Sequence, residues 1–407
     1  MNKLFFFTLT FVLTGLLPAA SCQSSNKKNH PPVSDNVSES EFKQNILTGA
    51  EQFETYLPLL KNKRIGLAVN HTSMVKDTHL ADTLLSLGIQ VKRIFSPEHG
   101  FRGKADAGEK VNHEKDPKTG LPIISLYGNN KKPTADQLKD LDVIVFDIQD
   151  VGVRFYTYIS TMHYIMEACA ESGKQVIVLD RPNPNGHYID GPVLKPAHKS
   201  FVGIHPIPIV HGLTVGELAK MINGEGWLDK GVKCDLVVIP CKNYTHNTRY
   251  SLPTKPSPNL PNDLSIQLYP SLCLFEGTPV SVGRGTDMPF QVFGMPEKDF
   301  GAFSFTPKST DGAKNPPYEN QLCFGKNLNA EKVKEGFTLD YLIYSYQKTS
   351  DKDKFFTNFF ESLAGTETLR KQIKEGWTQE KIRESWKEDL LRYKSIRKKY
   401  LLYPDFE

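Results

Sequence analysis

The sequence has little excess charge of either sign. Its formal net charge is only +4 over 407 residues, and charged residues make up 24% of it, which is ordinary for a globular chain. No dense basic stripe occurs before the C-terminus, where the Lys/Arg-rich stretch IRESWKEDLLRYKSIRKKY has the pattern of a solvated amphipathic helix. We therefore expect no nucleic-acid partner.

Cysteines are few, and their spacing excludes the usual roles of cysteine clusters. Five follow Cys22, an odd number that cannot all pair, and their spacings match no zinc pattern. Cys234 and Cys241 flank an apparent strand, CDLVVIPC, whose ends lie roughly 23 Å apart at about 3.3 Å per residue, too far for a disulfide. We interpret the five mostly as small core residues.

Motifs for common cofactors are also absent. No G-x-G-x-x-G follows the first predicted strand, which argues against a dinucleotide. No H-x-H or H-E-x-x-H spacing indicates a metal, although a metal held by scattered Asp, His and Glu side chains stays an alternative. We expect an activity that needs neither cofactor nor metal.

The N-terminus has the pattern of a targeting segment. Lys3 precedes an apolar run, LFFFTLTFVLTGLLPAA, that is short for a membrane span and ends in the small residues before Cys22. This pattern predicts a lipoprotein signal peptide over residues 1–21, lipidation of Cys22 and a flexible tether over 22–44. A plain cleaved signal is the alternative. We expect a periplasmic protein held at the outer membrane by its lipid alone.

Beyond residue 45, short apolar runs alternate with stretches of helical period. Strand patterns occupy residues 64–70, 90–96, 121–128, 141–149, 174–180 and 235–240, and helix patterns occupy residues 77–88, 133–141, 158–173 and 214–228. The apolar runs lack polar alternation, as expected for strands covered on both faces. This rhythm predicts a Rossmann-like, doubly wound α/β domain with a mostly parallel sheet over residues 45–249.

The second half of the chain changes character. Residues 250–262 are Pro-rich, and a helical period returns from about residue 338 to residue 400. We predict a smaller C-terminal α/β domain over residues 250–407 that closes a cleft against the first domain.

Polar residues gather where the predicted strands end. Parallel α/β sheets bind ligands at the carboxyl ends of their strands, so we expect these side chains on one rim. An alternative for the segment DRPNPNG at 180–186 is a structured turn without a binding role. An alternative for Asp147 is that its carboxylate accepts hydrogen bonds from loop amides. The rim candidates are Asn70 after the first strand, Glu98, His99 and Arg102 after the second, Asp147, Gln149, Asp150 and Arg154 after the fourth, and Asp180, Arg181, Asn183 and Asn185 after the fifth.

Two further candidates come from the second half. Glu276 stands between an apolar segment and Gly277, and the loop GRGTD contains Arg284 and Thr286. Glycines let the backbone approach a ligand closely. The alternative is a turn between two elements.

Six motifs in one order carry a family resemblance. They are SPEHGFRGKADAGE (96–109), TGLPIISLYG (119–128), VFDIQDVGVRFYTYISTM (145–162), LDRPNPNG (179–186), HGLTVGELA (211–219) and FEGTPVSVGRGTDMPF (275–290). Together they resemble the exo-β-N-acetylmuramidase (NamZ-like) family, over nearly all of the chain beyond residue 45. The resemblance implies a hydrolase that releases N-acetylmuramic acid (MurNAc) from the non-reducing ends of peptidoglycan, including MurNAc-N-acetylglucosamine fragments.

The implied chemistry assigns roles to the candidates. Glycoside hydrolysis needs an acid for the leaving oxygen and a group on the other face of the sugar. Glu98, beside His99, is the candidate acid, and Asp150, Asp147 and Glu276 are open for the second role. The substrate's own acetamido group, oriented by a carboxylate, is a further possibility. The lactyl carboxylate of MurNAc needs cationic donors, for which Arg154, Arg284 and Arg102 are candidates, and Tyr156, Asn183 and His211 are candidates for sugar contacts.

Two other functions fit the same residues. One is a metal-dependent esterase or phosphatase, which would lose activity after chelation. The other is a non-catalytic lipoprotein that binds muropeptides, which would keep its function after Glu98→Gln.

Overall fold

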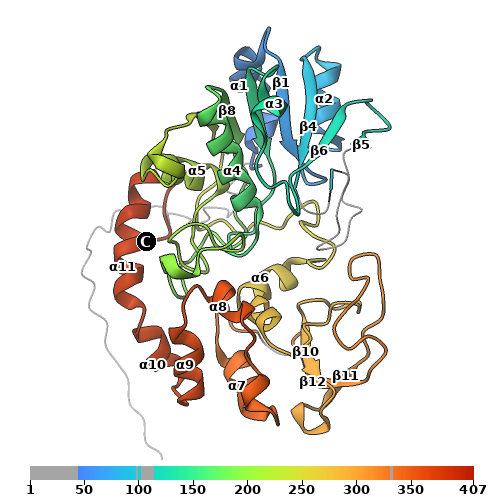
Figure 1. The fold of residues 1–407 in the computed structure, drawn as a ribbon, viewed down its shortest axis with the longest axis vertical. Coiled ribbons are helices and arrows are strands. Elements are labelled where there is room, and N and C mark those ends of the chain that lie inside the picture. The colour runs from blue at the N-terminus through green and yellow to red at the C-terminus, as the bar shows by residue number, and fades with distance from the viewer. Residues whose placement is uncertain (1–44, 98–99, 102–113, 331–332) are drawn as a thin grey trace, which may run out of the picture. The chain divides into compact units, whose positions relative to one another are not determined.

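The computed structural model describes residues 45–97, 100–101, 114–330 and 333–407 (Figure 1). The predicted signal peptide, Cys22 and the tether lie outside these residues, so these three assignments stay predictions. No helix of the described part combines the length and the apolar character needed to cross a membrane.

A seven-stranded sheet forms the first domain, in the order β5-β6-β4-β1-β7-β8-β9. Six strands pair in parallel, and β5 pairs antiparallel with β6 at one edge. In chain order the parallel strands run 3-2-1-4-5-6, the doubly wound order with its switch point between β1 and β7. The predicted fold class is therefore confirmed. The strands are β1 (Ile65–Val69), β4 (Val91–Ser96), β5 (Glu114–Lys115), β6 (Pro122–Ser125), β7 (Val143–Asp147), β8 (Gln175–Leu179) and β9 (Asp235–Ile239).

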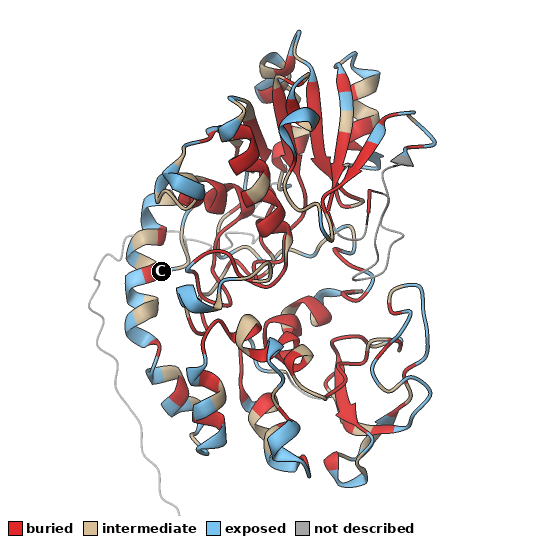
Figure 2. Cartoon of the chain, viewed as in Figure 1, coloured by how far each residue is buried: buried red, intermediate tan, exposed pale blue. Residues whose placement is uncertain are grey.

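Helices cover both faces of this sheet, which explains its continuous apolar strands (Figure 2). Alternate residues of β7 show the division, because Ile144 belongs to one hydrophobic core and Val145 to the other. The helices α4 (Tyr158–Glu171) and α5 (Val215–Gly224) pack in the first core, with α3 (Ala135–Leu138). The second core contains α1 (Phe53–Leu60) and α2 (Leu80–Ser86).

The smaller C-terminal domain combines helices with a three-stranded antiparallel sheet, in the order β10-β12-β11. Its strands are β10 (Val292–Met295), β11 (Phe303–Phe305) and β12 (Cys323–Asn327). Its helices are α6 (Asp263–Leu272), α7 (Asp340–Lys348), α8 (Phe359–Ala364), α9 (Thr368–Lys374), α10 (Gln379–Glu384) and α11 (Lys387–Arg397).

The end of the chain returns to the first domain, where α11 lies beside α5 (Figure 1). The Tyr393 hydroxyl donates to the His211 carbonyl at 2.6 Å, and the Arg397 guanidinium donates to the Gly212 carbonyl at 2.7 and 3.0 Å. Residues of both predicted domains therefore enclose His211, which is completely buried, while the boundary at residue 250 stays a prediction.

The five cysteines after Cys22 are all buried and free, as predicted. The interpretation of these residues as small members of the core is confirmed, since Cys169, Cys234 and Cys273 belong to the first hydrophobic core and Cys241 and Cys323 to two smaller hydrophobic clusters.

Candidate functional site

Three of the predicted site residues, Glu98, His99 and Arg102, lie outside the described residues. Strand β4 ends at Ser96, two positions before Glu98, so the sequence places this segment after the carboxyl end of a central strand. Their proposed roles remain predictions.

Most other rim candidates are buried and hydrogen-bonded within the protein. The Asn70 side-chain oxygen accepts from the backbone N–H of Thr72 at 2.9 Å and from its hydroxyl at 2.6 Å. The Gln149 amide donates to the carbonyls of Asp150 and Pro182 at 2.9 and 2.7 Å. These two side chains fix the loops that follow β1 and β7.

The Asp147 carboxylate is occupied by an ion pair. Arg181 donates to its two oxygens at 2.6 and 2.8 Å and to the Met74 carbonyl at 3.0 Å. Asp147 is completely buried and Arg181 is 5% exposed. This bidentate pair joins the ends of β7 and β8 and leaves Asp147 no oxygen exposed to a substrate.

Asp180 caps helix α5 rather than facing solvent. Its carboxylate accepts from the Thr214 hydroxyl at 2.7 Å and from the Gly216 N–H at 2.8 Å, and Tyr403 also donates to it. A carboxylate at a helix N-terminus accepts hydrogen bonds from the free N–H groups and interacts favourably with the positive end of the helix dipole.

The two asparagines of LDRPNPNG also bind backbone groups. Asn183 donates to the Leu213 carbonyl at 2.8 Å, and its side-chain oxygen accepts from the N–H of Asn185. Asn185 donates to the Val151 carbonyl at 2.9 Å. Both side chains are buried, so their predicted contact with a substrate finds no support in this geometry.

Asp150 and His211 form a buried pair behind the rim. His211 Nε2 lies 3.9 Å from Asp150 Oδ2, which accepts from the Gly152 N–H at 2.6 Å. Burial raises the pKa of Asp150 to about 7 and lowers the pKa of His211 to about 3. Among the described residues, Asp150 Oδ1 and His211 Nε2 have no hydrogen-bond partner. His211 is therefore neutral at pH 7, whereas the Asp150 carboxyl changes from neutral to charged around that pH.

The structure corrects the prediction for Arg154, which is completely buried. Nη1 donates to the Pro192 and Ile207 carbonyls, and Nη2 donates to the Leu363 and Ala364 carbonyls, each at 2.8 Å. Four carbonyls use the donors that would have bound a substrate carboxylate. Arg154 instead joins a loop of the first domain to the end of α8.

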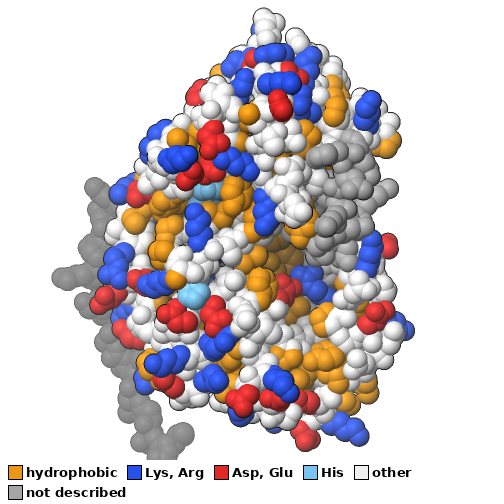
Figure 3. All heavy atoms as spheres, viewed as in Figure 1, with side chains coloured by type: hydrophobic (Ala, Val, Ile, Leu, Met, Phe, Trp, Pro, Cys, Tyr) orange, Lys and Arg blue, Asp and Glu red, His pale blue; other side chains and the backbone are white. Residues whose placement is uncertain are grey.

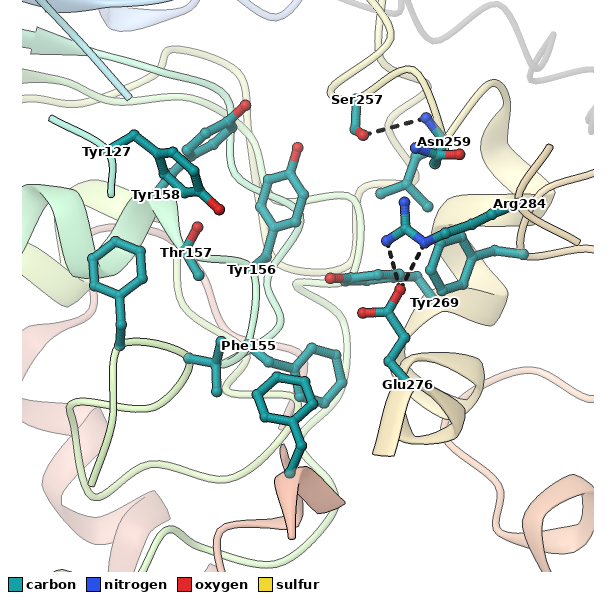
Figure 4. A pocket seen from close by; sticks show the side chains of 15 residues that line it. Tyr127, Phe155, Tyr156, Thr157, Tyr158, Ser257, Asn259, Tyr269, Glu276 and Arg284 are labelled. Atoms are coloured by element: carbon teal, nitrogen blue, oxygen red, sulfur yellow. Dashed lines mark hydrogen bonds and ion pairs between the residues drawn. The ribbon is translucent and has the colours of Figure 1, made fainter. Parts of the chain in front are cut away.

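A cavity of about 250 Å³ lies where the two domains meet. The first domain contributes Tyr127, which follows β6, and residues 155–158 at the start of α4, while the C-terminal domain contributes Glu276 and Arg284 (Figure 4). Figure 3 shows a hollow in this face of the molecule, in which hydrophobic side chains surround an acidic and a basic one. The structure thus brings the predicted residues Tyr156, Glu276 and Arg284 together.

Glu276 and Arg284 form one wall of this cavity. Arg284 Nε and Nη2 lie 2.7 and 2.6 Å from the same carboxylate oxygen, and the guanidinium stacks over the Phe290 ring at 5.0 Å. The third guanidinium nitrogen points away from Glu276, toward the side of the cavity with Ser257 and Asn259 (Figure 4). The second oxygen of Glu276 also points away from Arg284 (Figure 4). The Cys273 thiol donates to that second oxygen at 3.9 Å, so the guanidinium is the group with a side directed away from its hydrogen-bond partners.

Aromatic rings form the floor between the two domains. Tyr269 makes edge contacts with Tyr156 at 5.9 Å and Phe155 at 5.5 Å, and the Tyr156 hydroxyl donates to the Pro256 carbonyl at 2.7 Å. The hydroxyl of Tyr156 is thus used by the protein, and its ring is the part that can face a sugar. Rings of this kind pack against the apolar faces of sugars.

Thr286 does not line the cavity, because its hydroxyl donates to the Gly283 carbonyl at 2.6 Å and closes its own loop. Tyr127, Tyr269 and Phe359 line the cavity as well, although they were not among the predicted site residues. Tyr127 had a weak signal, since it lies near the end of the strand predicted over residues 121–128; the observed strand β6 ends earlier, at Ser125. The other two carry none, because only the packing of the two domains brings them to the cavity.

The residues that the structure describes contain no group of three His, Cys, Asp or Glu side chains arranged to hold a metal ion. The chemistry available in the described cavity is that of one carboxylate, one guanidinium, amide and hydroxyl groups, and aromatic faces.

Comparison with known proteins gives consistent matches. The family models for exo-beta-N-acetylmuramidase NamZ match residues 65–264 (N-terminal) and 267–403 (C-terminal). The chain is 38% identical to the peptidoglycan beta-N-acetylmuramidase NamZ of Bacillus subtilis (strain 168), over 99% of this chain and 100% of that protein.

Two crystal structures of DUF1343 family proteins from Bacteroides fragilis NCTC 9343 share the fold. One is 53% identical with a TM-score of 0.83, covering 89% of this chain and 99% of that chain. The other is 31% identical with a TM-score of 0.75, covering 88% and 99%. The resemblance predicted from the six motifs is confirmed.

Proposed function

This chain belongs to the exo-beta-N-acetylmuramidase NamZ family, and we propose that it is an exo-acting glycoside hydrolase that releases MurNAc from the non-reducing ends of peptidoglycan fragments. The observation that supports this most is the cavity between the domains, where an arginine-carboxylate wall faces an aromatic floor.

We assign recognition of the lactyl carboxylate to Arg284. Its third guanidinium nitrogen is directed away from Glu276, on the side of Ser257 and Asn259 (Figure 4). A substrate carboxylate there gains a charge-assisted hydrogen bond in a partly desolvated site. Arg154 is unsuited to this role because four carbonyls hold it.

For the second catalytic group we favour Glu276 over the two rim aspartates. Asp147 is locked by Arg181, and Asp150 is buried beside His211, whereas the Glu276 side chain is 29% exposed and lines the cavity. An ionised carboxylate can act on the anomeric face or accept from the acetamido N–H, so that the substrate's carbonyl oxygen attacks. Glu98 remains the proposed acid for the leaving oxygen.

The test of this function is the Glu98→Gln variant, measured with a chromogenic β-N-acetylmuraminide. We expect turnover to fall by about 100-fold or more, the usual scale of general acid catalysis, while the unfolding midpoint stays unchanged. Glu54→Gln, at an exposed position of α1, is the matched control and should retain full turnover. Turnover near wild type in Glu98→Gln would exclude Glu98 as the acid.

We also propose that the chain is a lipoprotein anchored through Cys22 on the periplasmic side of the outer membrane, with residues 22–44 as its tether. The support is the apolar run and the small residues that precede Cys22. Cys22→Ser should move the protein from the detergent phase to the aqueous phase in detergent partitioning. An unchanged partition would refute lipidation at this residue.

A further inference from the structure

The side chains that line the cavity differ in exposure, which gives it a floor and a mouth. Phe290, Tyr269 and Tyr156 are 1%, 7% and 8% exposed, whereas Phe359 is 43% exposed. Phe359 therefore lies where the cavity opens to solvent. A glycan whose terminal sugar enters the cavity must leave it past this mouth.

The fold does not need an aromatic ring at position 359. Its neighbour Phe360 is completely buried and packs on Phe356, with ring centroids 4.5 Å apart. Phe359 makes no ring or cation–π contact with any residue that the structure describes. Among those residues the exposed large hydrophobic side chains are Leu87, Leu322, Phe359 and Leu391. Of these only Phe359 is aromatic and only Phe359 lines the cavity.

The position of Phe359 is fixed relative to the catalytic wall. Thr357, two residues earlier, donates from its N–H and its hydroxyl to the Gly277 carbonyl at 2.9 and 3.1 Å. A Cβ on Gly277 would lie only 2.5 Å from the Cα of Phe360, so the start of α8 presses directly on the residue after Glu276. An exposed ring on a rigid support is preorganised for a ligand.

Phe201, another partly exposed aromatic ring of the cavity, is already engaged. Phe201 stacks on Tyr164, with centroids 6.3 Å apart and planes 10° from parallel, and the Lys131 ammonium lies 4.4 Å from its centroid. Its backbone carbonyl accepts from the Ser160 hydroxyl at 2.7 Å. Phe359 is thus the better placed of the two rings to offer a free face.

We propose that Phe359 is the stacking platform for the leaving sugar, the uncharged 2-acetamido pyranose that follows the scissile bond. The inference rests on the proposed function. The anionic terminal sugar is matched by Arg284 inside the cavity, whereas the next sugar carries no carboxylate and presents apolar C–H groups. A partly exposed ring at the mouth can stack on this sugar while the sugar stays connected to the rest of the glycan outside the cavity.

The test compares two substrates with the same terminal sugar. One is the MurNAc-β-1,4-N-acetylglucosamine disaccharide, and the other is β-N-acetylmuramyl fluoride, whose leaving group has no ring. Phe359→Ala should lower the specificity constant for the disaccharide about tenfold more than that for the fluoride. Phe359→Trp, which keeps a flat ring, should restore most of this difference, and Phe359→Leu should not. Leu391→Ala removes another exposed hydrophobic side chain, 57% exposed, that does not line the cavity, and it should alter neither constant.

Each result decides the matter. Equal losses on both substrates would overturn the proposal, because the ring would then act on the terminal sugar. No loss on either substrate would also overturn it, because the ring would then touch no substrate. Hydrolysis of neither substrate by the wild-type protein would remove the proposed function itself, a result distinct from the other two.

Discussion

Arg154 and Arg284 belong to two regions that use the same side chain differently. Arg154 lies at the strand-end rim of the sheet, completely buried, with four carbonyls as partners. Arg284 lies on the cavity wall, where one oxygen of Glu276 takes two of its nitrogens and the side chain is 22% exposed. The first arginine organises the protein, and the second has a donor left for a ligand.

Other rim side chains are, like Arg154, hydrogen-bonded within the protein, because the C-terminal half of the chain packs against the rim. Tyr403 donates to Asp180, and Asn185 donates to the Ile266 carbonyl as well as to Val151. These contacts use polar groups that an isolated sheet would leave open after the carboxyl end of β8. The open space lies instead between Tyr127 and Tyr156 on one side and the wall from the C-terminal domain on the other.

The largest effect is expected at Arg154. Arg154→Met keeps the volume but leaves four buried carbonyls without donors, so the free energy of unfolding should fall by about 5 kcal/mol. Burial lowers the pKa of Arg154 to about 9, which still leaves it charged at pH 7. Urea unfolding measures the loss, with Arg284→Met as the control that should change stability far less. A stable Arg154→Met protein with lost activity would show that the rim arginine does serve the substrate.

The fold was predictable because the strands of the large sheet have a clear pattern in the sequence. Residues of β7 are apolar without interruption, and burial on both faces is the reason. Helix α1 was not predicted, and Pro58 within it is a residue that ordinarily ends helices. Packing of Tyr56 and Leu60 in the second core outweighs this local preference.

The site was predictable only in part. The strand-end rule found residues that lie at the correct edge, yet it cannot say which side chains the returning chain covers. Glu276 and Arg284 were found because glycines surround them in the sequence. Phe359 follows from no local pattern, since its place at the cavity depends on Gly277 meeting the start of α8.

A smaller effect on stability, and one that depends on pH, is expected at Asp150. In the folded protein the pKa of Asp150 is about 7, above the usual value, so the folded state is more stable when this carboxyl is neutral than when it is charged. This contribution is fully present below pH 4 and is lost as the pH rises to about 7. Asp150→Asn cannot ionise, so it should match the wild type at pH 4 and exceed its stability at pH 8 by about 4 kcal/mol. Urea unfolding at both pH values measures this, and a variant weaker than the wild type at pH 8 would show that the charged carboxylate is stabilised in the folded protein.

The smallest of the three effects concerns selectivity at Arg284. MurNAc differs from N-acetylglucosamine by the lactyl ether with its carboxylate, so only the muraminide should depend on the guanidinium. Because Glu276 already takes two of its nitrogens, we expect the remaining interaction to be worth about 2 kcal/mol, or roughly 30-fold in the specificity constant. Arg284→Ala also leaves Glu276 without its partner, which affects both substrates, so the ratio of the muraminide and glucosaminide constants is the quantity to measure. Arg249→Ala removes another arginine paired with a carboxylate, Glu335 at 2.8 Å, on the surface, and this control should leave the ratio unchanged. If Arg284→Ala lowers both constants by the same factor, the cavity wall does not recognise the lactyl group, and Arg284 only holds Glu276 in place.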